Sequence, residues 1–480
     1  MTRDEQLRLA DGCRIALTAV RPCGPGPWPT VLIRTPYGRT NLLGEARGWA
    51  ASGFACVVAD VRGRFGSTGE FRPYVHEADD GAAVLEHVLH RPFCDGRVLL
   101  AGASYGAFCA VATALRRPRA ASGVLVAVPA LGPGETAREP GGAARLECRV
   151  GWWHEHGGRR VPGSPVRPGL GGLRRLPVRG LLRDVPGWNA LWDAPRRDPD
   201  LWAGLAGLRL PLLAVGGTAD PFAGDLLDLA LGWGGPARLL IGPWGHSLDA
   251  PRPGAALAGR RIGAVYARWA AAMWSGEVTP RTRRLVAAHE SGGWGELATA
   301  PRPVPLDVLR ARFTADPDDP FPSRPLGSDL GAPPPHCAVL RTPPLPAMTL
   351  RGPLTVALSA RTEAGDADWV VRVSTRIGNG RRELTRAVLR RGASPGDAAF
   401  ALTTPPVGAV LAAGTQLLVE VAGHHWPAHA RNPHTGEDAA DATVLTADRR
   451  AVHSGVLHLP CADPAIPALP AASIPEEIAS

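Results

Sequence analysis

Short, uninterrupted apolar segments recur through the first half of the chain. They lie at residues 30–33, 55–59, 97–102, 123–128, 210–217 and 237–242. Runs of this length predict strands that are buried on both faces, as in a parallel sheet. Between several of them the pattern becomes helical, for example over residues 77–90 and 107–117. Strands that alternate with helices in this way predict a doubly wound α/β domain.

The pattern changes at both ends of this region and once within it. Alternating residues around Asp11-Gly12 predict a hairpin ahead of the first buried strand. Between residues 130 and 208, Gly, Pro, Arg and Trp dominate and no strand pattern recurs, which predicts a mostly helical cap inserted into the sheet. Beyond Pro301, period-two segments between Gly/Pro turns indicate a β-sandwich. The expected units are therefore an α/β domain at 1–129 and 209–300, a cap at 130–208, a β domain at 301–465 and a loosely held tail at 466–480.

Lysine is absent, so all 53 of the residues counted as Lys or Arg are arginine. This excludes mechanisms that need a lysine amine, such as a P-loop nucleotide site, a Schiff base or a Ser-Lys dyad. The 58 Gly and 49 Pro indicate a compositional bias behind the net charge of +9, and we expect no nucleic-acid partner. The start of the sequence lacks an apolar signal segment, and no window of 18 residues is apolar enough to span a membrane. These features predict a soluble, cytoplasmic protein with no membrane partner.

One motif carries most of the chemical information. Gly102-Ala103-Ser104-Tyr105-Gly106 is a G-x-S-x-G sequence between an apolar run and a helical pattern. In a strand, sharp turn, helix arrangement the glycines remove side chains that would clash, and the serine hydroxyl is exposed at the edge of the sheet. The motif alone is common, but its placement predicts that Ser104 is a nucleophile.

A serine hydroxyl needs a base to take its proton and a carboxylate to orient that base. Asp220 follows the apolar run at 210–217, and His246 follows the run at 237–242. The order Ser, acid, His is the one expected in this type of sheet, so we predict a triad of Ser104, Asp220 and His246. Asp225 is a rival acid, although a place in the first turn of a helix explains it better.

Several segments resemble the cocaine-esterase-like hydrolases, a family that includes X-Pro dipeptidyl-peptidases, α-amino-acid ester hydrolases and glutaryl acylases. The matching segments are RTPYGR (34–39), DVRGRFGSTGEF (60–71), CDGRVLLAGASYGA (94–107), GGTADPF (216–222), IGPWGHS (241–247), DADWVVRV (366–373) and RNPHTGE (431–437). The resemblance implies an α/β-hydrolase domain with a helical cap and a C-terminal jelly-roll domain.

The resemblance also implies roles for residues outside the triad. By analogy, the Tyr37 hydroxyl and the backbone N–H of Tyr105 form the oxyanion hole, and Phe222 lines the acyl pocket, although a core role for Phe222 is equally compatible. Arg62 and Arg64 belong to a structural loop. Three histidines that lie close together in the C-terminal part of the sequence have a spacing that superficially resembles that of metal ligands. The resemblance places them in a surface or interface loop, and we predict no metal. They are His424, His425 and His429.

These features together predict a serine hydrolase that cleaves a small-molecule acyl ester or amide through an acyl-enzyme, without a cofactor. Three alternatives remain open: a dipeptidyl-peptidase-like amidase, an acyltransferase with the same triad, or a lapsed hydrolase that acts as a binding protein. Homo-oligomer formation is also open.

The cap is the most basic part of the sequence. From Arg138 to Asp200 it has 12 arginines and 7 acidic residues. One hypothesis is that the cap presents positive potential at the mouth of the site and favours neutral or carboxylate-bearing acyl groups over those with an ammonium group. The compositional bias of the whole chain explains the same excess equally well.

Overall fold

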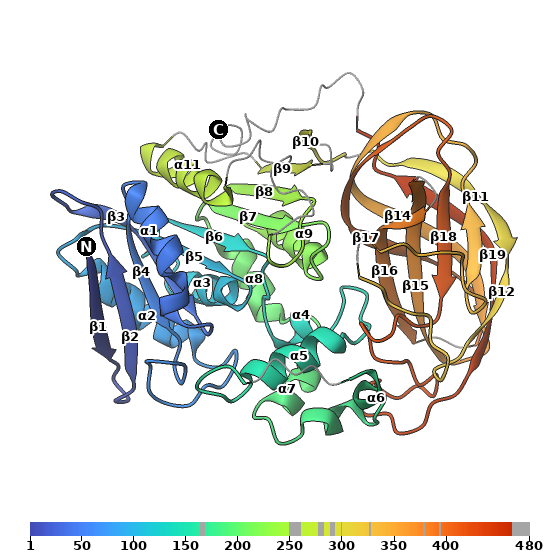
Figure 1. Ribbon diagram of the computed structural model, residues 1–480, viewed down its shortest axis with the longest axis horizontal. Coiled ribbons are helices and arrows are strands. Elements are labelled where there is room, and N and C mark those ends of the chain that lie inside the picture. Colours follow the sequence, from blue (N-terminus) through green and yellow to red (C-terminus); the bar gives the residue numbers. More distant parts are fainter. Residues whose placement is uncertain are drawn as a thin grey trace.

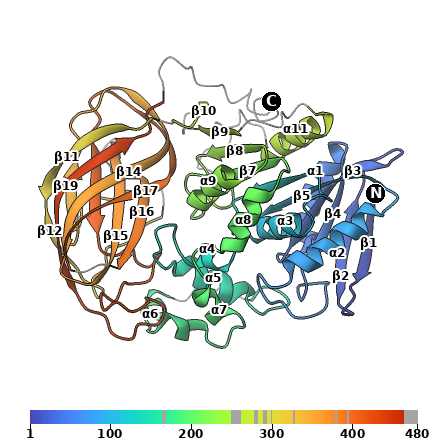
Figure 2. The same ribbon diagram turned by 180° about the vertical axis from the view of Figure 1, so that it is seen from behind.

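The computed structural model describes residues 1–163, 169–248, 261–276, 283–288, 293–298, 300–325, 328–377, 380–392 and 395–462. Within these residues two β-sheet domains lie side by side, and short helices join them along one edge (Figure 1; Figure 2). The expected tail at 466–480 lies outside the described residues. Among the described helices, none combines the length and the apolar character that a membrane span requires.

The first sheet has ten described strands in the order β1-β2-β4-β3-β5-β6-β7-β8-β9-β10. The strands from β4 to β9 are paired in parallel, whereas β1, β2 and β10 are antiparallel to their neighbours. The predicted hairpin is confirmed as β1 and β2, in which Leu7 pairs with Ile15. The strands are β1 (Thr2–Arg8), β2 (Arg14–Val20), β3 (Trp28–Thr35), β4 (Ala55–Asp60), β5 (Cys94–Ala103), β6 (Gly123–Ala127), β7 (Leu212–Gly217), β8 (Ala237–Gly242), β9 (Arg283–Ala288) and β10 (Trp294–Glu296).

Helices cover both faces of this sheet. In β3, Leu32 packs into one apolar core while Val31 and Ile33 pack into the other. The first core includes α2 (Glu77–Leu89), α3 (Tyr105–Arg116), α8 (Pro199–Gly207) and α9 (Ala223–Gly232). The second includes α1 (Leu43–Ala51), which follows the short helix η1 (Arg39–Leu42), and α11 (Ile262–Ser275). Burial on both sides explains why the strands read as continuous apolar runs.

The segment between β6 and β7 contains α4 (Pro133–Ala137), α5 (Glu147–His156), α6 (Leu170–Leu173), η2 (Val178–Leu182), α7 (Trp188–Asp193) and α8. The structure moves the end of the expected cap. Asp198 caps α8, Pro199 opens it, and Leu205 packs in the core of the α/β domain. Residues 199–208 thus belong to the α/β layer, because the crossover between parallel strands needs a helix against the sheet.

The C-terminal domain is an antiparallel β-sandwich. Its strand order is β16-β15-β18-β13-β11-β19-β14-β17, with β12 also paired to β19. The first half of β11 pairs with β19 and its second half with β13, so this strand passes from one layer to the other. The strands are β11 (Arg302–Arg310), β12 (Arg312–Ala315), β13 (Ala338–Arg341), β14 (Met348–Thr362), β15 (Asp366–Ile377), β16 (Gly380–Gly392), β17 (Gly396–Leu411), β18 (Leu417–Ala422) and β19 (Asp448–Leu459).

The cap shares its apolar core with the C-terminal domain. Trp153, Trp188 and Trp192 of the cap pack with Trp426 and Ala430, which lie between β18 and β19. The cap helices therefore sit between the two domains, as both views of the molecule show (Figure 1; Figure 2).

Arginines of the cap reinforce these contacts. Arg196 lies 2.5 Å from Asp225 of α9, and Arg138 lies 2.8 Å from Asp438 of the C-terminal domain. Further pairs of this kind are Arg145 with Asp225, Arg179 with Asp441, and Arg197 with Asp228. Much of the positive charge of the cap thus neutralises carboxylates of the neighbouring domains. Fewer arginines are then left to create a positive potential at the mouth of the site.

Glu139 is a largely buried member of this interface. Its carboxylate lies 2.9 Å from Arg145 and 2.8 Å from His429 of the C-terminal domain. Burial alone would raise the pKa of Glu139, but the charges of Arg145 and His429 hold it well below its ordinary value of 4.5. Glu139 therefore stabilises the fold above that value, and this contribution is lost as the pH falls toward the folded-state pKa.

We predict that Glu139→Gln lowers the free energy of unfolding at pH 7 by about 1–3 kcal/mol, because charge-assisted hydrogen bonds across the interface are lost. Denaturant titrations at pH 7 and pH 3 should show the gap between wild type and variant narrowing in acid. Glu70→Gln, at an exposed site, is the matched control. A gap that is equal at both pH values would contradict the role given to the Glu139 charge.

Candidate active site

Ser104 occupies the single residue between β5 and α3, as the sequence predicts. Its backbone has φ 54° and ψ −122°, a conformation that non-glycine residues seldom adopt. A Cβ atom on Gly102 would lie 2.2 Å from the carbonyl oxygen of Gly106. Glycine at 102 is therefore required for the turn that exposes the Ser104 hydroxyl.

The turn is fixed by hydrogen bonds to the end of the neighbouring strand. The N–H of Ser104 donates to the carbonyl of Ala127 at 2.9 Å, and the N–H of Ala130 donates to the carbonyl of Ser104 at 3.2 Å. Because β5 and β6 are parallel neighbours, the strained residue is held by regular sheet structure on one side and by α3 on the other.

Two loops that follow β7 and β8 carry Asp220 and His246. The N–H of Ala219 donates to the carbonyl of Trp244 at 2.9 Å, which joins the loops directly. A Cβ atom on Gly217 would lie 1.9 Å from the same carbonyl oxygen, so this close approach depends on glycine. The two loops are thereby placed against each other at the carboxyl edge of the sheet.

The structure brings Ser104, Asp220 and His246 into one hydrogen-bonded chain. His246 Nε2 lies 3.0 Å from Ser104 Oγ, and His246 Nδ1 lies 2.9 Å from Asp220 Oδ1. The Asp220 side chain is completely buried, whereas the His246 side chain is 39% exposed. Asp220 Oδ1 also accepts the N–H of Phe222 at 3.1 Å. With Asp220 ionised, Nδ1 carries the proton of His246 and Nε2 is free to accept one from Ser104.

Tyr37 approaches Ser104 from a different strand. It follows β3, and its backbone N–H is held by Thr35 Oγ1 at 3.0 Å. The Tyr37 hydroxyl lies 3.3 Å from Ser104 Oγ. Burial raises the pKa of Tyr37, so its hydroxyl remains a proton donor near neutral pH.

Trp152 of α5 determines which way the Tyr37 proton can point. The indole Nε1 lies 3.1 Å from the Tyr37 hydroxyl oxygen. Since an indole N–H can only donate, the phenol oxygen must accept this hydrogen bond. The proton of Tyr37 is then directed elsewhere, and Ser104 Oγ is the neighbouring acceptor.

Tyr105 contributes its backbone to the site and its side chain to the core. It is the first residue of α3, where backbone N–H groups have no partner within the helix. An interaction with the Tyr105 backbone lowers the pKa of Tyr37 slightly, against the larger rise that burial imposes. The phenol is buried below, where it donates to Glu77 Oε1 and accepts the N–H of Tyr74 at 2.7 Å.

Phe222 lines the pocket that contains Ser104 and is 2% exposed. Its ring lies edge-on to His246, with centroids 5.5 Å apart. The guanidinium carbons of Arg145 and Arg149 lie 5.0 and 5.3 Å from the same ring. Phe222 therefore packs against two guanidinium groups and the imidazole of His246.

The remaining residues weighed in the sequence have structural contacts. Arg62 pairs with Asp80 at 2.6 Å. Arg64 is buried and donates to the Pro36 carbonyl at 2.8 Å, beside Tyr37. Asp225 accepts from Arg196, which anchors the cap and does not involve His246. His429 is 2.8 Å from Glu139.

Sequence reasoning missed the contributions of α5. Cys148, Arg149, Trp152 and Glu155 line the pocket of about 380 Å³ that contains Ser104 and His246. The sequence of α5 contains no motif that indicates a functional role, and its Trp152-Trp153 pair indicates only that the cap is rich in aromatic residues. Spacings of three and four residues place these side chains on one helical face, but nothing in the sequence indicates that this face covers Ser104.

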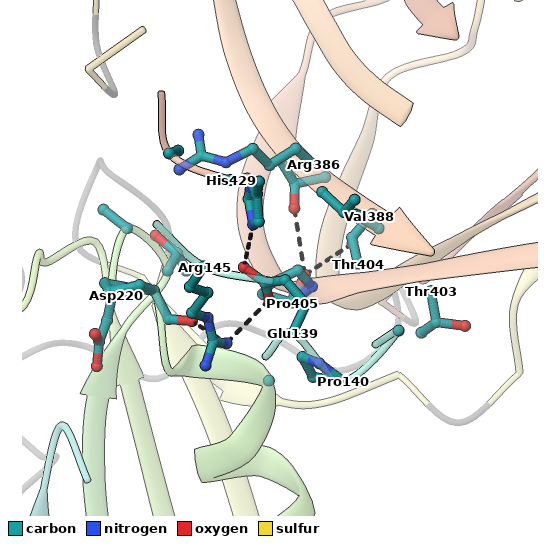
Figure 3. A pocket seen from close by; sticks show the side chains of 18 of the residues that line it. Glu139, Pro140, Arg145, Asp220, Arg386, Val388, Thr403, Thr404, Pro405 and His429 are labelled. Carbon is teal, nitrogen blue, oxygen red and sulfur yellow. Dashed lines mark hydrogen bonds and ion pairs between the residues drawn. The ribbon is translucent and has the colours of Figure 1, made fainter. Parts of the chain in front are cut away.

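A second cavity of about 270 Å³ lies between the cap, α9 and the C-terminal domain. Figure 3 shows Arg145 and His429 directed at Glu139, with Thr404 and Arg386 of the β-sandwich close by. Both cavities are bordered by Glu147, Cys148 and Pro221. The β-sandwich therefore reaches a cavity that adjoins the pocket of Ser104.

Known proteins share this architecture. The chain's match to the cocaine esterase of Rhodococcus sp. (strain MB1 Bresler) is 29% identical over 276 residues, or 50% of this chain, and spans about half (48%) of that protein's length. An α-amino acid ester hydrolase structure superimposes with a TM-score of 0.79 at 18% identity, and an aminopeptidase from a Thaumarchaeota archaeon of marine sediment with 0.80 at 18%. Each covers 96% of this chain and 96% of its own. At such identities these two structures establish the fold.

Family profiles match both domains in turn. The profile of X-Pro dipeptidyl-peptidase (S15 family) matches residues 11–248, and that of the X-Pro dipeptidyl-peptidase C-terminal non-catalytic domain matches residues 330–456. Together they span most of the chain in the expected order. The chain therefore belongs to the S15 family of X-Pro dipeptidyl-peptidase-like and cocaine-esterase-like hydrolases.

Proposed function

We propose that this protein cleaves carboxylic esters of small molecules by acyl transfer to Ser104 and then to water. The observation that carries the proposal is the hydrogen-bonded chain from Asp220 through His246 to Ser104 Oγ, with Tyr37 at the same oxygen. Neither a metal nor a cofactor takes part in the proposed reaction.

Each side chain has a defined task in this reaction. Ser104 Oγ attacks the carbonyl carbon while His246 Nε2 takes its proton, and Asp220 keeps the imidazole in the required tautomer. The carbonyl oxygen gains negative charge and is stabilised by the Tyr37 hydroxyl and the Tyr105 N–H. His246 then gives the proton to the leaving-group oxygen, and the C–O bond to that group breaks. A water molecule, deprotonated by His246, then attacks the acyl carbon. The bond to Ser104 Oγ breaks, His246 returns the proton to Ser104, and the acid is released.

The relatives leave the type of leaving group open, since an esterase, an amino acid ester hydrolase and an aminopeptidase share the fold. The same side chains can protonate an alcohol or an amine. Each experiment below is therefore run on substrate pairs, an ester and the amide of the same acid. Hydroxylamine is added in parallel, because its acylation in place of water would reveal acyl transfer.

Ser104→Ala should abolish labelling by a fluorophosphonate probe and reduce kcat toward 4-nitrophenyl esters by at least about 10⁴-fold, because the nucleophile is lost. Ser52→Ala, at an exposed serine at the end of α1, should leave both unchanged. Substantial esterase activity in Ser104→Ala would contradict the proposal, and absence of any labelled wild-type protein would favour the lapsed-hydrolase alternative.

Tyr37→Phe removes one of the two proposed oxyanion donors while it keeps the ring. We expect kcat to fall about 10²–10³-fold with little change in KM, because the interaction strengthens only in the transition state. Steady-state kinetics on an ester with a chemically limited acylation step measures this directly. An unchanged kcat would remove Tyr37 from the oxyanion hole.

Trp152→Phe tests whether the indole positions Tyr37. Loss of the N–H should lower kcat about tenfold, since one hydrogen bond that directs the phenol is lost. In a Tyr37→Phe background the same change should have almost no further effect, because no hydroxyl remains to be directed. A double-mutant cycle measures this coupling, and two additive losses would show that Trp152 acts only by packing.

A further inference from the structure

Arg149 is a buried cation without a partner in the pocket of Ser104. Its side chain belongs to α5, and the residue is only 6% exposed. The Nε atom is sealed from solvent and has no hydrogen-bond partner. Its guanidinium carbon lies 5.3 Å from the centre of the Phe222 ring, and within the described residues no carboxylate pairs with it. A buried guanidinium cannot lose its proton, so an unpaired one is costly.

Arg145, whose guanidinium also lies close to the Phe222 ring, provides a contrast. It pairs with Glu139 and Asp225 and donates to the carbonyls of Glu135 and Pro221. The carboxylates of Glu139 and Asp225 thus neutralise the charge of Arg145, whereas within the described residues no carboxylate pairs with Arg149. The charge of Arg149 is therefore available to pair with a group of a ligand that enters the pocket.

The position of the Arg149 charge is fixed by its neighbours. It lies against Phe222 and lowers the pKa of both Tyr37 and Tyr74, against the larger rise that burial imposes on each. Tyr74 and Phe222 line the pocket together with Ser104 and Trp152. The guanidinium therefore borders the cavity in which the reacting ester is held.

From this arrangement we infer that Arg149 binds a carboxylate carried by the acyl part of the substrate, so that the preferred substrates are monoesters of dicarboxylic acids. The inference rests on the proposed hydrolysis at Ser104. A guanidinium matches a carboxylate with two parallel hydrogen bonds. An anion in the pocket would also neutralise the buried charge.

The acyl side is favoured by the distribution of exposure. His246, which has to protonate the leaving group, has a side chain that is 39% exposed. Arg149 is only 6% exposed and lies against the Phe222 ring. A departing group needs the open side, whereas the acyl group stays bound through both steps and suits the enclosed side.

Two carboxylates also line this pocket and limit which anion fits. The Glu155 side chain is 36% exposed and lies 3.7 Å from His156 Nε2, and Glu147 has a partner of its own. With these negative charges nearby, one guanidinium accommodates a single negative charge better than a phosphate dianion. An ammonium group would be drawn to the exposed Glu155 but repelled from the buried end by Arg149.

The test compares 4-nitrophenyl monoadipate with 4-nitrophenyl methyl adipate and with an acyl chain that ends in trimethylammonium. We expect wild type to prefer the carboxylate over the neutral ester by about tenfold or more in kcat/KM, as for a charge-assisted hydrogen bond. Arg149→Gln should remove this preference, measured as the ratio of kcat/KM for the carboxylate and the neutral ester within the same variant. Arg183→Gln, an exposed cap arginine, removes the same charge and should keep the preference.

Two further arms separate the possible results. Phenyl acetates with and without a carboxylate on the phenol place the charge in the leaving group, and a preference only there would overturn the acyl-side assignment. Adipate should inhibit wild type competitively, and at least about tenfold more weakly after Arg149→Gln. If Arg149→Gln does not fold, the substrate preferences of the wild type and its inhibition by adipate still test whether the pocket binds a carboxylate on the acyl side.

The outcomes also distinguish this inference from the proposed function. Hydrolysis of the neutral ester without any carboxylate preference, or with a preference for the ammonium chain, overturns the role of Arg149 and leaves the role of Ser104 intact. No hydrolysis of any ester and no labelling of Ser104 overturns both.

Discussion

A single imidazole joins three separate parts of the chain. His246 reaches Asp220 through Nδ1 and Ser104 through Nε2, at 2.9 and 3.0 Å. Each of the three residues follows a different strand in the parallel part of one sheet. The geometry depends on backbone approaches that leave no room for a Cβ atom, at Gly102 near Ser104 and at Gly217 near Asp220. The sheet supplies the rigidity with which a strained Ser104 can be held at a positive φ.

The cap covers this site, and its side chains have two kinds of role. Arg145 and Arg196 are paired with carboxylates and attach the cap to its neighbours. Trp152 and Arg149, on α5, instead face the pocket. The shared core with Trp426 means that the C-terminal domain stabilises the cap, and through it the position of α5 over Ser104.

Much of this could be predicted from the sequence, for reasons that are local. Apolar runs buried on two faces identify the strands, and the G-x-S-x-G turn together with chain order identifies Ser104, Asp220 and His246. Tyr37 came only from the family resemblance, because a tyrosine after a proline has no distinctive pattern. Arg149 could not be singled out among the cap arginines, since only three-dimensional contacts show that Arg145 forms ion pairs whereas Arg149 lies against the Phe222 ring. The packing of α8 could not be predicted either, because its sequence resembles the other cap segments and only the structure shows its contact with the sheet.

The most direct test of the central claim is to capture the covalent intermediate. The protein is mixed with an activated ester, quenched in acid within the turnover time and digested, and the mass of the peptide that contains Ser104 is measured. The account predicts that this peptide gains the mass of the acyl group, at a level that decays as hydrolysis finishes. Steady hydrolysis with an unmodified Ser104 peptide, or with the acyl group on another residue, would contradict it.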